Sequence, residues 1–81
     1  MTNTKKLQGK MREKAYTIKT LGARIGLTTT GLFNKIHNNR EFLASEVYNI
    51  SVALSLTTEE VNEIFFANSV ESNSTKQIEG V

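Results

Sequence analysis

Cysteine, proline, tryptophan and aspartate are absent from this chain of 81 residues, and histidine occurs once. Without cysteine, the chain has no disulfides, no thiolate metal sites and no cysteine nucleophile. Because every acid is glutamate and His37 is the single imidazole, few combinations remain that build a metal site or a catalytic triad. No apolar run approaches the ~20 residues that a membrane span needs. We therefore expect a cytoplasmic chain that is not an enzyme, has no catalytic or metal site, needs no cofactor and does not contact a membrane.

The residues that are present suit one small domain, but their charges are divided unevenly. Hydrophobic residues make up 38% of the chain and charged residues 22%, which is ordinary for a compact domain. Residues 1–40 hold nine lysines and arginines and one glutamate, a balance of +8, whereas residues 41–81 hold one lysine and seven glutamates, a balance of −6. This asymmetry indicates that the basic half forms a surface that binds a polyanion. The alternative is that both halves are simply solvated helix surfaces.

The spacing of apolar residues predicts an all-α fold of five helices. Apolar side chains recur at steps of three and four, and β-branched alternation is scarce. The helices are expected over residues 4–15, 18–25, 28–36, 44–54 and 57–66, with threonine N-caps at Thr17, Thr28 and Thr57. Phe42, Phe65 and Phe66 are expected in the core. The polar composition beyond residue 67 predicts a disordered C-terminal tail, so the domain is placed at 1–67 and the tail at 68–81.

Residues 18–37 have the features of a helix-turn-helix. Two short helical segments flank a turn at residues 26–28, where Gly26 allows the positive φ of a tight turn. Gly22 provides a small side chain where the two segments cross, and leucine and isoleucine residues on either side lock the pair together.

The stretch at 21–36 (LGARIGLTTTGLFNKI) resembles the helix-turn-helix of phage Cro and immunity repressors of the lambda-repressor/XRE type. Residues 40–42 (REF), 45–50 (SEVYNI) and 63–66 (EIFF) are similar to the small phage-associated branch of that family. The resemblance covers about residues 5–67. It implies a compact five-helix, lambda-repressor-like DNA-binding domain and a transcriptional regulator that binds operator DNA in a sequence-specific manner.

The resemblance also implies roles for individual residues. In such domains the N-terminal part of the second helix of the motif meets the base edges in the major groove. The implied base-reading residues are Thr28, Thr29, Thr30, Phe33, Asn34 and His37. Phosphate contacts fix the register of the protein on the duplex. The implied phosphate-binding residues are Thr17, Lys19, Lys35, Asn38, Asn39 and Arg40.

A second hypothesis stays open at this point. The predicted recognition helix lacks arginine and glutamine, which are among the most informative base readers, and it exposes Phe33. Aromatic anchors suit protein interfaces. The alternative is therefore a modulator or antirepressor of the same fold, which binds a partner phage repressor and blocks its DNA contacts. A homodimer through the C-terminal helix is a further expectation, and its candidate residues are Ile64, Phe65, Phe66 and Val70.

Overall fold

The computed structural model describes residues 1–67, and these residues form helices and turns. In chain order the elements are α1 (Thr4–Glu13), α2 (Ile18–Ile25), α3 (Thr29–Ile36), α4 (Ala44–Ala53), α5 (Thr58–Val61) and the π-helical segment η1 (Asn62–Phe66), which continues α5. The expected all-α class is confirmed for this part of the chain. None of its helices is both long enough and apolar enough to cross a bilayer. The tail expected at 68–81 lies outside the described residues.

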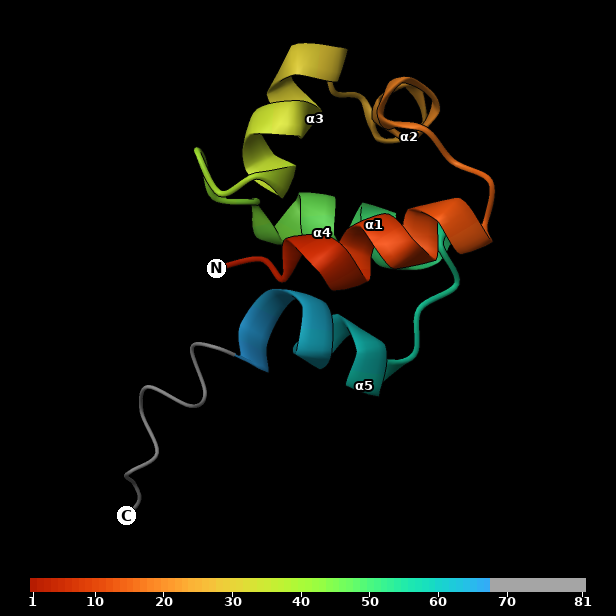
Figure 1. The fold of residues 1–81 in the computed structure, drawn as a ribbon, viewed down its shortest axis with the longest axis vertical. Helices are drawn as coiled ribbons and strands as arrows, with labels where there is room; N and C mark the ends of the chain where they lie inside the picture. Colours follow the sequence, from red (N-terminus) through yellow and green to blue (C-terminus); the bar gives the residue numbers. More distant parts are fainter. Residues whose placement is uncertain (68–81) are drawn as a thin grey trace.

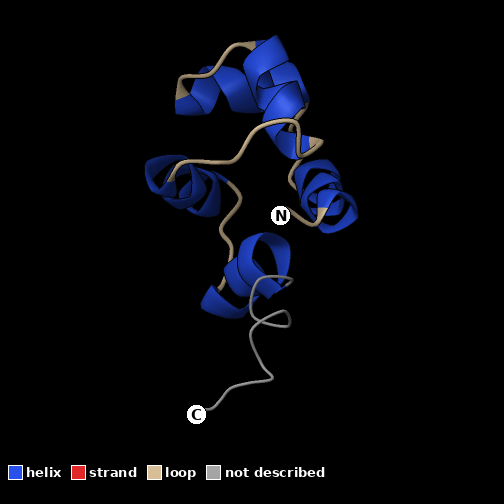
Figure 2. Cartoon of the chain, turned by 90° about the vertical axis from the view of Figure 1, so that its left-hand side faces the viewer, coloured by secondary structure: helices blue, strands red, loops and turns tan. Residues whose placement is uncertain are grey.

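The helices lie in three levels along the long axis of the molecule (Figure 1). The α2–α3 pair forms one end, α1 and α4 form the middle, and α5 forms the other end. Figure 2 shows the two middle helices nearly end-on, so both run across the long axis, with α4 on one flank and α1 on the other. Contacts of α2 with α3 hold the pair together, and contacts of α2 with α4 and of α1 with η1 join the levels. The α2–α3 end is thereby separated from α5.

The core draws on all three levels. Large apolar side chains that recur at helical spacing turn inward together, and burying each one stabilises the fold by about 1.5–3 kcal/mol. The buried apolar residues are Leu7, Met11, Leu21, Leu32, Ile36, Val47, Ile50, Leu54, Ile64 and Phe65.

The three phenylalanines expected in the core have different environments. Phe65 is buried and meets the partly buried Phe42 edge-on, with ring centroids 5.4 Å apart. The expectation was wrong for Phe66, which is 44% exposed. Neighbouring residues on a helix do not share a face, so Phe65 takes the inward position and Phe66 faces out.

Threonine side chains begin three of the helices, as expected. The hydroxyls of Thr17, Thr28 and Thr57 each accept a hydrogen bond from the backbone N–H three residues on. The cap of α1 is Asn3, whose side chain accepts from the N–H of Lys6, and the sequence did not point to it. Helix α1 ends at Glu13, two residues before the expected end, because Ala15 takes a left-handed conformation with φ of 62°.

The turn between α2 and α3 depends on two glycines. Gly26 has φ of 84°, the left-handed conformation expected for it. Gly22 is needed for space, because a Cβ atom there would lie 2.7 Å from the carbonyl oxygen of Leu27. The N–H of Leu27 in turn donates to the carbonyl of Gly22 at 2.8 Å. At Gly22, α2 therefore lies closer to the backbone of the turn than a residue with a Cβ atom would allow.

We expect Gly22→Ala to destabilise the fold by about 1–3 kcal/mol, since the turn backbone has to move to admit the methyl group. Gly9→Ala in the middle of α1 is the matched control, because a Cβ there meets nothing within 4 Å. The control should stabilise the fold by about 0.5–1 kcal/mol through helix propensity alone. Urea unfolding followed by circular dichroism measures both. Equal stabilisation by the two substitutions would contradict the close approach at Gly22.

Candidate nucleic-acid interface

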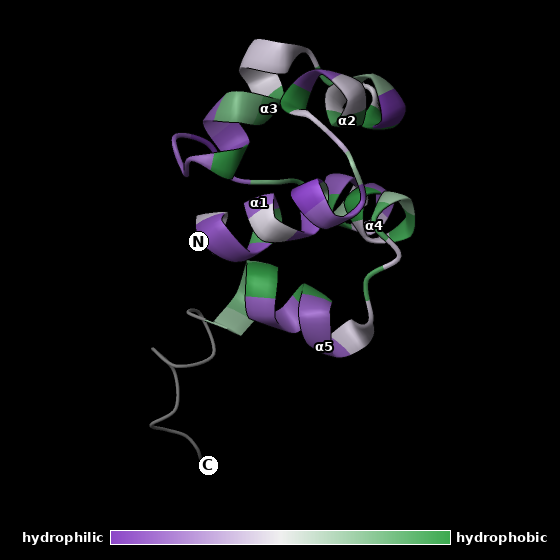
Figure 3. Ribbon diagram, turned by 45° about the vertical axis from the view of Figure 1, so that its right-hand side comes forward, coloured by the Kyte–Doolittle hydropathy of each residue, from purple (hydrophilic) through white to green (hydrophobic). Residues whose placement is uncertain are grey.

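The outward side of α3 collects the residues expected to read bases. Leu32 and Ile36 are fully buried on its inner side. On the outer side, positions three and four residues apart lie next to one another along the helix, which places them on one face. This surface, called the α3 face below, comprises Thr29, Thr30, Phe33, Asn34 and His37, with Thr28 at its start. All are exposed except Asn34, which is half-buried. The beginning of α3 is nearly white in Figure 3, since threonine has intermediate hydropathy.

The α3 face is uncharged and has an aromatic centre. Phe33 is 45% exposed, and its ring lies beside that of His37 with centroids 4.3 Å apart. The chemistry that it offers a base pair is an amide for adenine, through Asn34, hydrogen bonds from the threonine hydroxyls and the imidazole of His37, and apolar contact with thymine methyl groups, through Phe33 or the threonines.

The start of α2 presents a helix terminus suited to an anion. Thr17 and Thr20 form a reciprocal cap, in which each hydroxyl accepts from the backbone N–H of the other at 3.1 and 2.8 Å. Because the cap uses a second threonine instead of a glutamate, no acid in the first turn neutralises the positive end of the helix dipole. Thr17 and Lys19 are both exposed here, so they are accessible for the phosphate contacts expected of them.

The turn after α3 carries two more of the expected phosphate residues. The backbone N–H groups of Asn39 and Arg40 both donate to the carbonyl of Asn34, at 2.8 and 3.3 Å. These bonds fix the turn, and both side chains are exposed beyond the end of α3. Asn39 and Arg40 thus lie next to the last turn of the α3 face.

Lys35 does not lie where a phosphate contact requires it. Its ammonium donates to both carboxylate oxygens of Glu46, at 2.6 and 2.7 Å, and the two side chains are only 13% and 11% exposed. Glu46 also accepts from the backbone N–H of Leu43 at 2.9 Å. Burial acts to raise the pKa of Glu46, but the hydrogen bonds from Lys35 and Leu43 outweigh it and hold that pKa below its ordinary value. The geometry assigns Lys35 to fastening α3 onto the start of α4.

Asn38 is likewise occupied elsewhere. Its side-chain oxygen accepts from the N–H of Thr2 at 2.8 Å, and its amide nitrogen donates to the carbonyl of Thr2 at 3.0 Å. Thr4 adds a bond from its hydroxyl to the carbonyl of Ile36 at 2.7 Å. Asn38 has φ of 66° and is partly buried. It holds the N-terminal segment against the end of α3, which leaves no free amide for the phosphate contact expected of it.

Charge separates the two ends of the molecule. Between residues 14 and 40 the chain has five cations and no acid. With Lys35 paired, the exposed cations of this part are Lys14, Lys19, Arg24 and Arg40. The guanidinium of Arg24 donates to the hydroxyl of Tyr16 at 2.6 Å, a contact that the sequence did not suggest.

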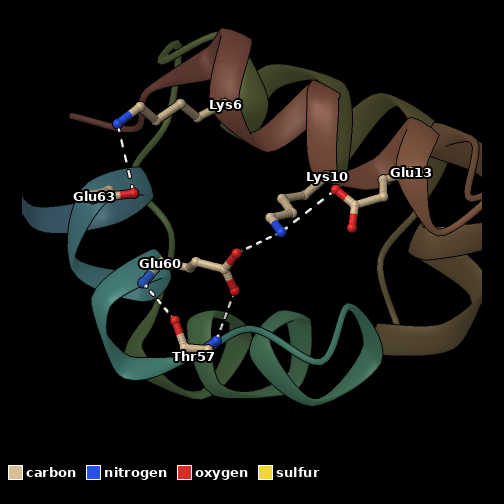
Figure 4. A network of polar contacts seen from close by, with 6 residues as sticks. All are labelled: Lys6, Lys10, Glu13, Thr57, Glu60 and Glu63. Carbon is tan, nitrogen blue, oxygen red and sulfur yellow. Dashed lines mark hydrogen bonds and ion pairs between the residues drawn. The ribbon is translucent and has the colours of Figure 1, made fainter.

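The α5 end is acidic, and the lysines of α1 that face it are paired. Figure 4 shows Lys6 beside Glu63 at 3.6 Å, and Lys10 beside Glu60 and Glu13 at 2.5 and 3.5 Å. The hydrogen bond with Glu60 raises the pKa of Lys10, and the same bond lowers the pKa of Glu60. These side chains line a shallow groove of about 280 Å³ between α1 and α5. The ion pairs neutralise this side of α1, whereas Lys19, Arg24 and Arg40 at the α2–α3 end form no ion pair within residues 1–67.

No three histidine or acidic side chains within residues 1–67 come close enough together to hold a metal ion. Comparison of the chain with protein-family models, with curated proteins and with solved structures gave no match.

We expect the pair of Lys35 and Glu46 to make stability depend on pH. A carboxyl whose pKa is lowered in the folded state contributes stability above its unfolded pKa and loses it as the pH falls through the folded value. Glu46→Gln should lower the free energy of unfolding at pH 7 by about 1–3 kcal/mol, since Lys35 is left without its partner. The loss of stability between about pH 5 and pH 3 should also become smaller than in the parent chain. Denaturant unfolding across this range measures both, with Glu59→Gln at an exposed site as the control. Parallel pH curves for the parent and Glu46→Gln would contradict the coupling.

Proposed function

We propose that this chain is a DNA-binding transcriptional regulator of the phage Cro and immunity-repressor kind. In this proposal α2, the turn at 26–28 and α3 form the helix-turn-helix of a lambda-repressor-like domain. The observation that supports it most is the combination of an exposed, uncharged α3 face with exposed cations on the same end of the molecule and paired acids at the other. In the field of a polyanion, such a charge distribution turns the α2–α3 end of the protein toward the polyanion.

In the proposed complex, α3 lies in the major groove and the α3 face meets the base edges. Asn34 pairs with an adenine, while Thr29, Thr30 and Phe33 contact thymine methyl groups. Thr17, Lys19, Asn39 and Arg40 contact the phosphates on either side, and Arg24 and Lys14 add positive potential. Because no charged side chain reads bases, most of the affinity comes from phosphate contacts and falls steeply with salt.

We expect Lys19→Gln and Arg40→Gln to weaken DNA binding by similar factors on the intergenic DNA beside the gene and on random duplex. Each should reduce the slope of log affinity against log salt by about 0.9, the value for one phosphate neutralised. Lys6→Gln is the matched control, because it removes the same charge from the groove facing Glu63. Fluorescence anisotropy titrations between low and physiological salt give the slopes. The control should leave the slope unchanged. If Lys19→Gln and Arg40→Gln also leave it unchanged, neither residue contacts a phosphate.

The exposed aromatic ring supports a second candidate function. Phe33 is 45% exposed at the centre of a face with no charged side chain, and desolvated aromatic anchors dominate many protein interfaces. On this reading the chain is a modulator or antirepressor, whose α3 face docks on the DNA-binding domain of a partner phage repressor. A protein partner does not require the basic end of the molecule, which therefore favours the DNA-binding candidate.

Two substitutions on the α3 face separate the candidates. If α3 reads DNA, Asn34→Ala should relax the preference at one base pair by about 1–3 kcal/mol, whereas Phe33→Ala has a smaller effect. If α3 docks on a repressor, Phe33→Ala should cost about 2 kcal/mol or more of binding and Asn34→Ala little. Both variants are titrated against DNA and against the DNA-binding domain of a repressor encoded beside this chain. Specific DNA binding that survives both substitutions would contradict the assigned role of the α3 face.

A further inference from the structure

Phe33 is an exposed aromatic side chain that the fold itself does not use. Its neighbour Leu32 is fully buried, whereas Phe33 is 45% exposed and is not among the side chains that pack on the core of residues 1–67. A single exposed apolar side chain needs no explanation by itself. This one, however, lies at the centre of the α3 face, which the proposed function places against the base edges of DNA.

The ring of Phe33 is held by the last turn of α3. The rings of Phe33 and His37, one turn further on, have centroids 4.3 Å apart and planes at 42° to each other. The backbone N–H of His37 donates to the carbonyl of Phe33 at 3.0 Å, which closes that turn. Contact with a second ring restricts the rotamers of Phe33, so less side-chain entropy is lost when a further group packs on it. Phe33 is thus a partly ordered apolar surface that remains open on the outside of the helix.

The surroundings of Phe33 on the α3 face are polar and uncharged. Thr29 and Thr30 precede it by four and three residues, which makes them its neighbours on the helix surface. Lys35 is the only charged residue of α3, and it is bonded to Glu46 instead. The face therefore has no arginine or lysine for the bidentate contact with guanine, the commonest specific contact in the major groove. Its one large apolar group is the phenyl ring.

The major groove offers such a ring one apolar group, the 5-methyl of thymine. The other groups that distinguish the base pairs there are hydrogen-bond donors and acceptors, which a phenyl ring does not satisfy. 5-Methylcytosine has the same methyl group at the same ring position as thymine, whereas uracil and cytosine lack it. An apolar ring in the groove therefore distinguishes pyrimidines by the presence of the 5-methyl group.

We propose that Phe33 is a specificity-determining residue that reads the 5-methyl group of a pyrimidine, with His37 as the residue that positions its ring. The chain then prefers thymine to uracil, and 5-methylcytosine to cytosine, at the position that Phe33 meets. The preference rests on the proposed function, because it requires α3 to lie in the major groove. Beyond that function, methylation of cytosine at C5 is expected to raise the affinity of this chain for its DNA.

One methyl group sets the size of the preference. Burying a carbon group of this size contributes about 0.8 kcal/mol, which corresponds to a factor of about four in affinity. Thr29 and Thr30 also present methyl groups, but each is smaller than a phenyl ring and stands beside a hydroxyl on the same carbon. The preference is therefore expected to depend on Phe33 more than on either threonine.

Base analogues test the proposal without any change in the charge of the DNA. In the intergenic duplex beside the gene, thymines are replaced singly by uracil, and fluorescence anisotropy at fixed salt gives each dissociation constant. We expect at least one replacement to weaken binding by about fourfold, since one methyl contact is lost. At that position, 5-methylcytosine opposite guanine should bind about fourfold more tightly than cytosine opposite guanine. The salt slopes should agree among these duplexes, because the phosphates are the same.

Substitutions assign the preference to one side chain. Phe33→Ala should bind the thymine and uracil duplexes equally, whereas Phe33→Leu, which keeps an apolar side chain, should retain part of the preference. His37→Ala should reduce the preference although Phe33 is present, as expected of a residue that positions the ring. Phe66→Ala is the matched control, because Phe66 is 44% exposed at the α5 end, and it should keep the whole preference. Circular dichroism confirms that each variant remains folded.

The outcomes separate this proposal from the proposed function. A methyl preference that survives Phe33→Ala overturns the assignment to Phe33, and Thr29→Ser and Thr30→Ser then show whether a threonine methyl makes the contact. Equal affinity for the thymine duplex and for every uracil duplex overturns the methyl reading and leaves DNA binding in place. Absence of binding to all of the duplexes overturns both.

Discussion

The buried pair of Lys35 and Glu46 is the interaction on which the α3 face depends. It removes the only charged side chain of α3 and the only charged side chain of α4 from the surface in one contact. Bringing two charges out of water is costly unless further hydrogen bonds satisfy them, and the N–H of Leu43 supplies one of these bonds. The pair fastens α3 to the start of α4, so the two helices keep a fixed relation to each other. The pair thereby joins α3, the recognition helix of the proposed function, directly to α4.

The N-terminal segment holds the same, C-terminal end of α3. Thr2 and Thr4 bond to Asn38 and to the carbonyl of Ile36, and the N–H of Asn3 donates to the carbonyl of Ile64 at 2.6 Å. Three consecutive residues therefore bond to both the end of α3 and to η1, which lie in different levels of the molecule. A small domain with a modest core gains rigidity from such links, because each satisfies polar groups that would otherwise lie unpaired near the core.

The sequence predicted the helices and their caps well, but it did not predict side-chain contacts between residues far apart in the chain. Helical periodicity and threonine caps fix α2 and α3 to within a residue, because both signals act within four residues of the chain. The partners of Lys35 and Asn38 lie 11 and 36 residues away, and no local pattern links them. The family resemblance implied phosphate contacts for both residues, whereas the fold pairs both of them with other parts of the chain.

The chemistry of the α3 face constrains how such a protein achieves selectivity. Under the proposed function, a face of threonines, asparagine, phenylalanine and histidine offers one bidentate amide, worth about 1–3 kcal/mol of discrimination, together with hydroxyl, imidazole and apolar contacts. If it binds DNA, a single domain of this kind has little preference for its own site over the many competing sites of a genome. Two copies that read two half-sites double the discrimination without any new base contact, provided that their α3 helices are held at one fixed spacing.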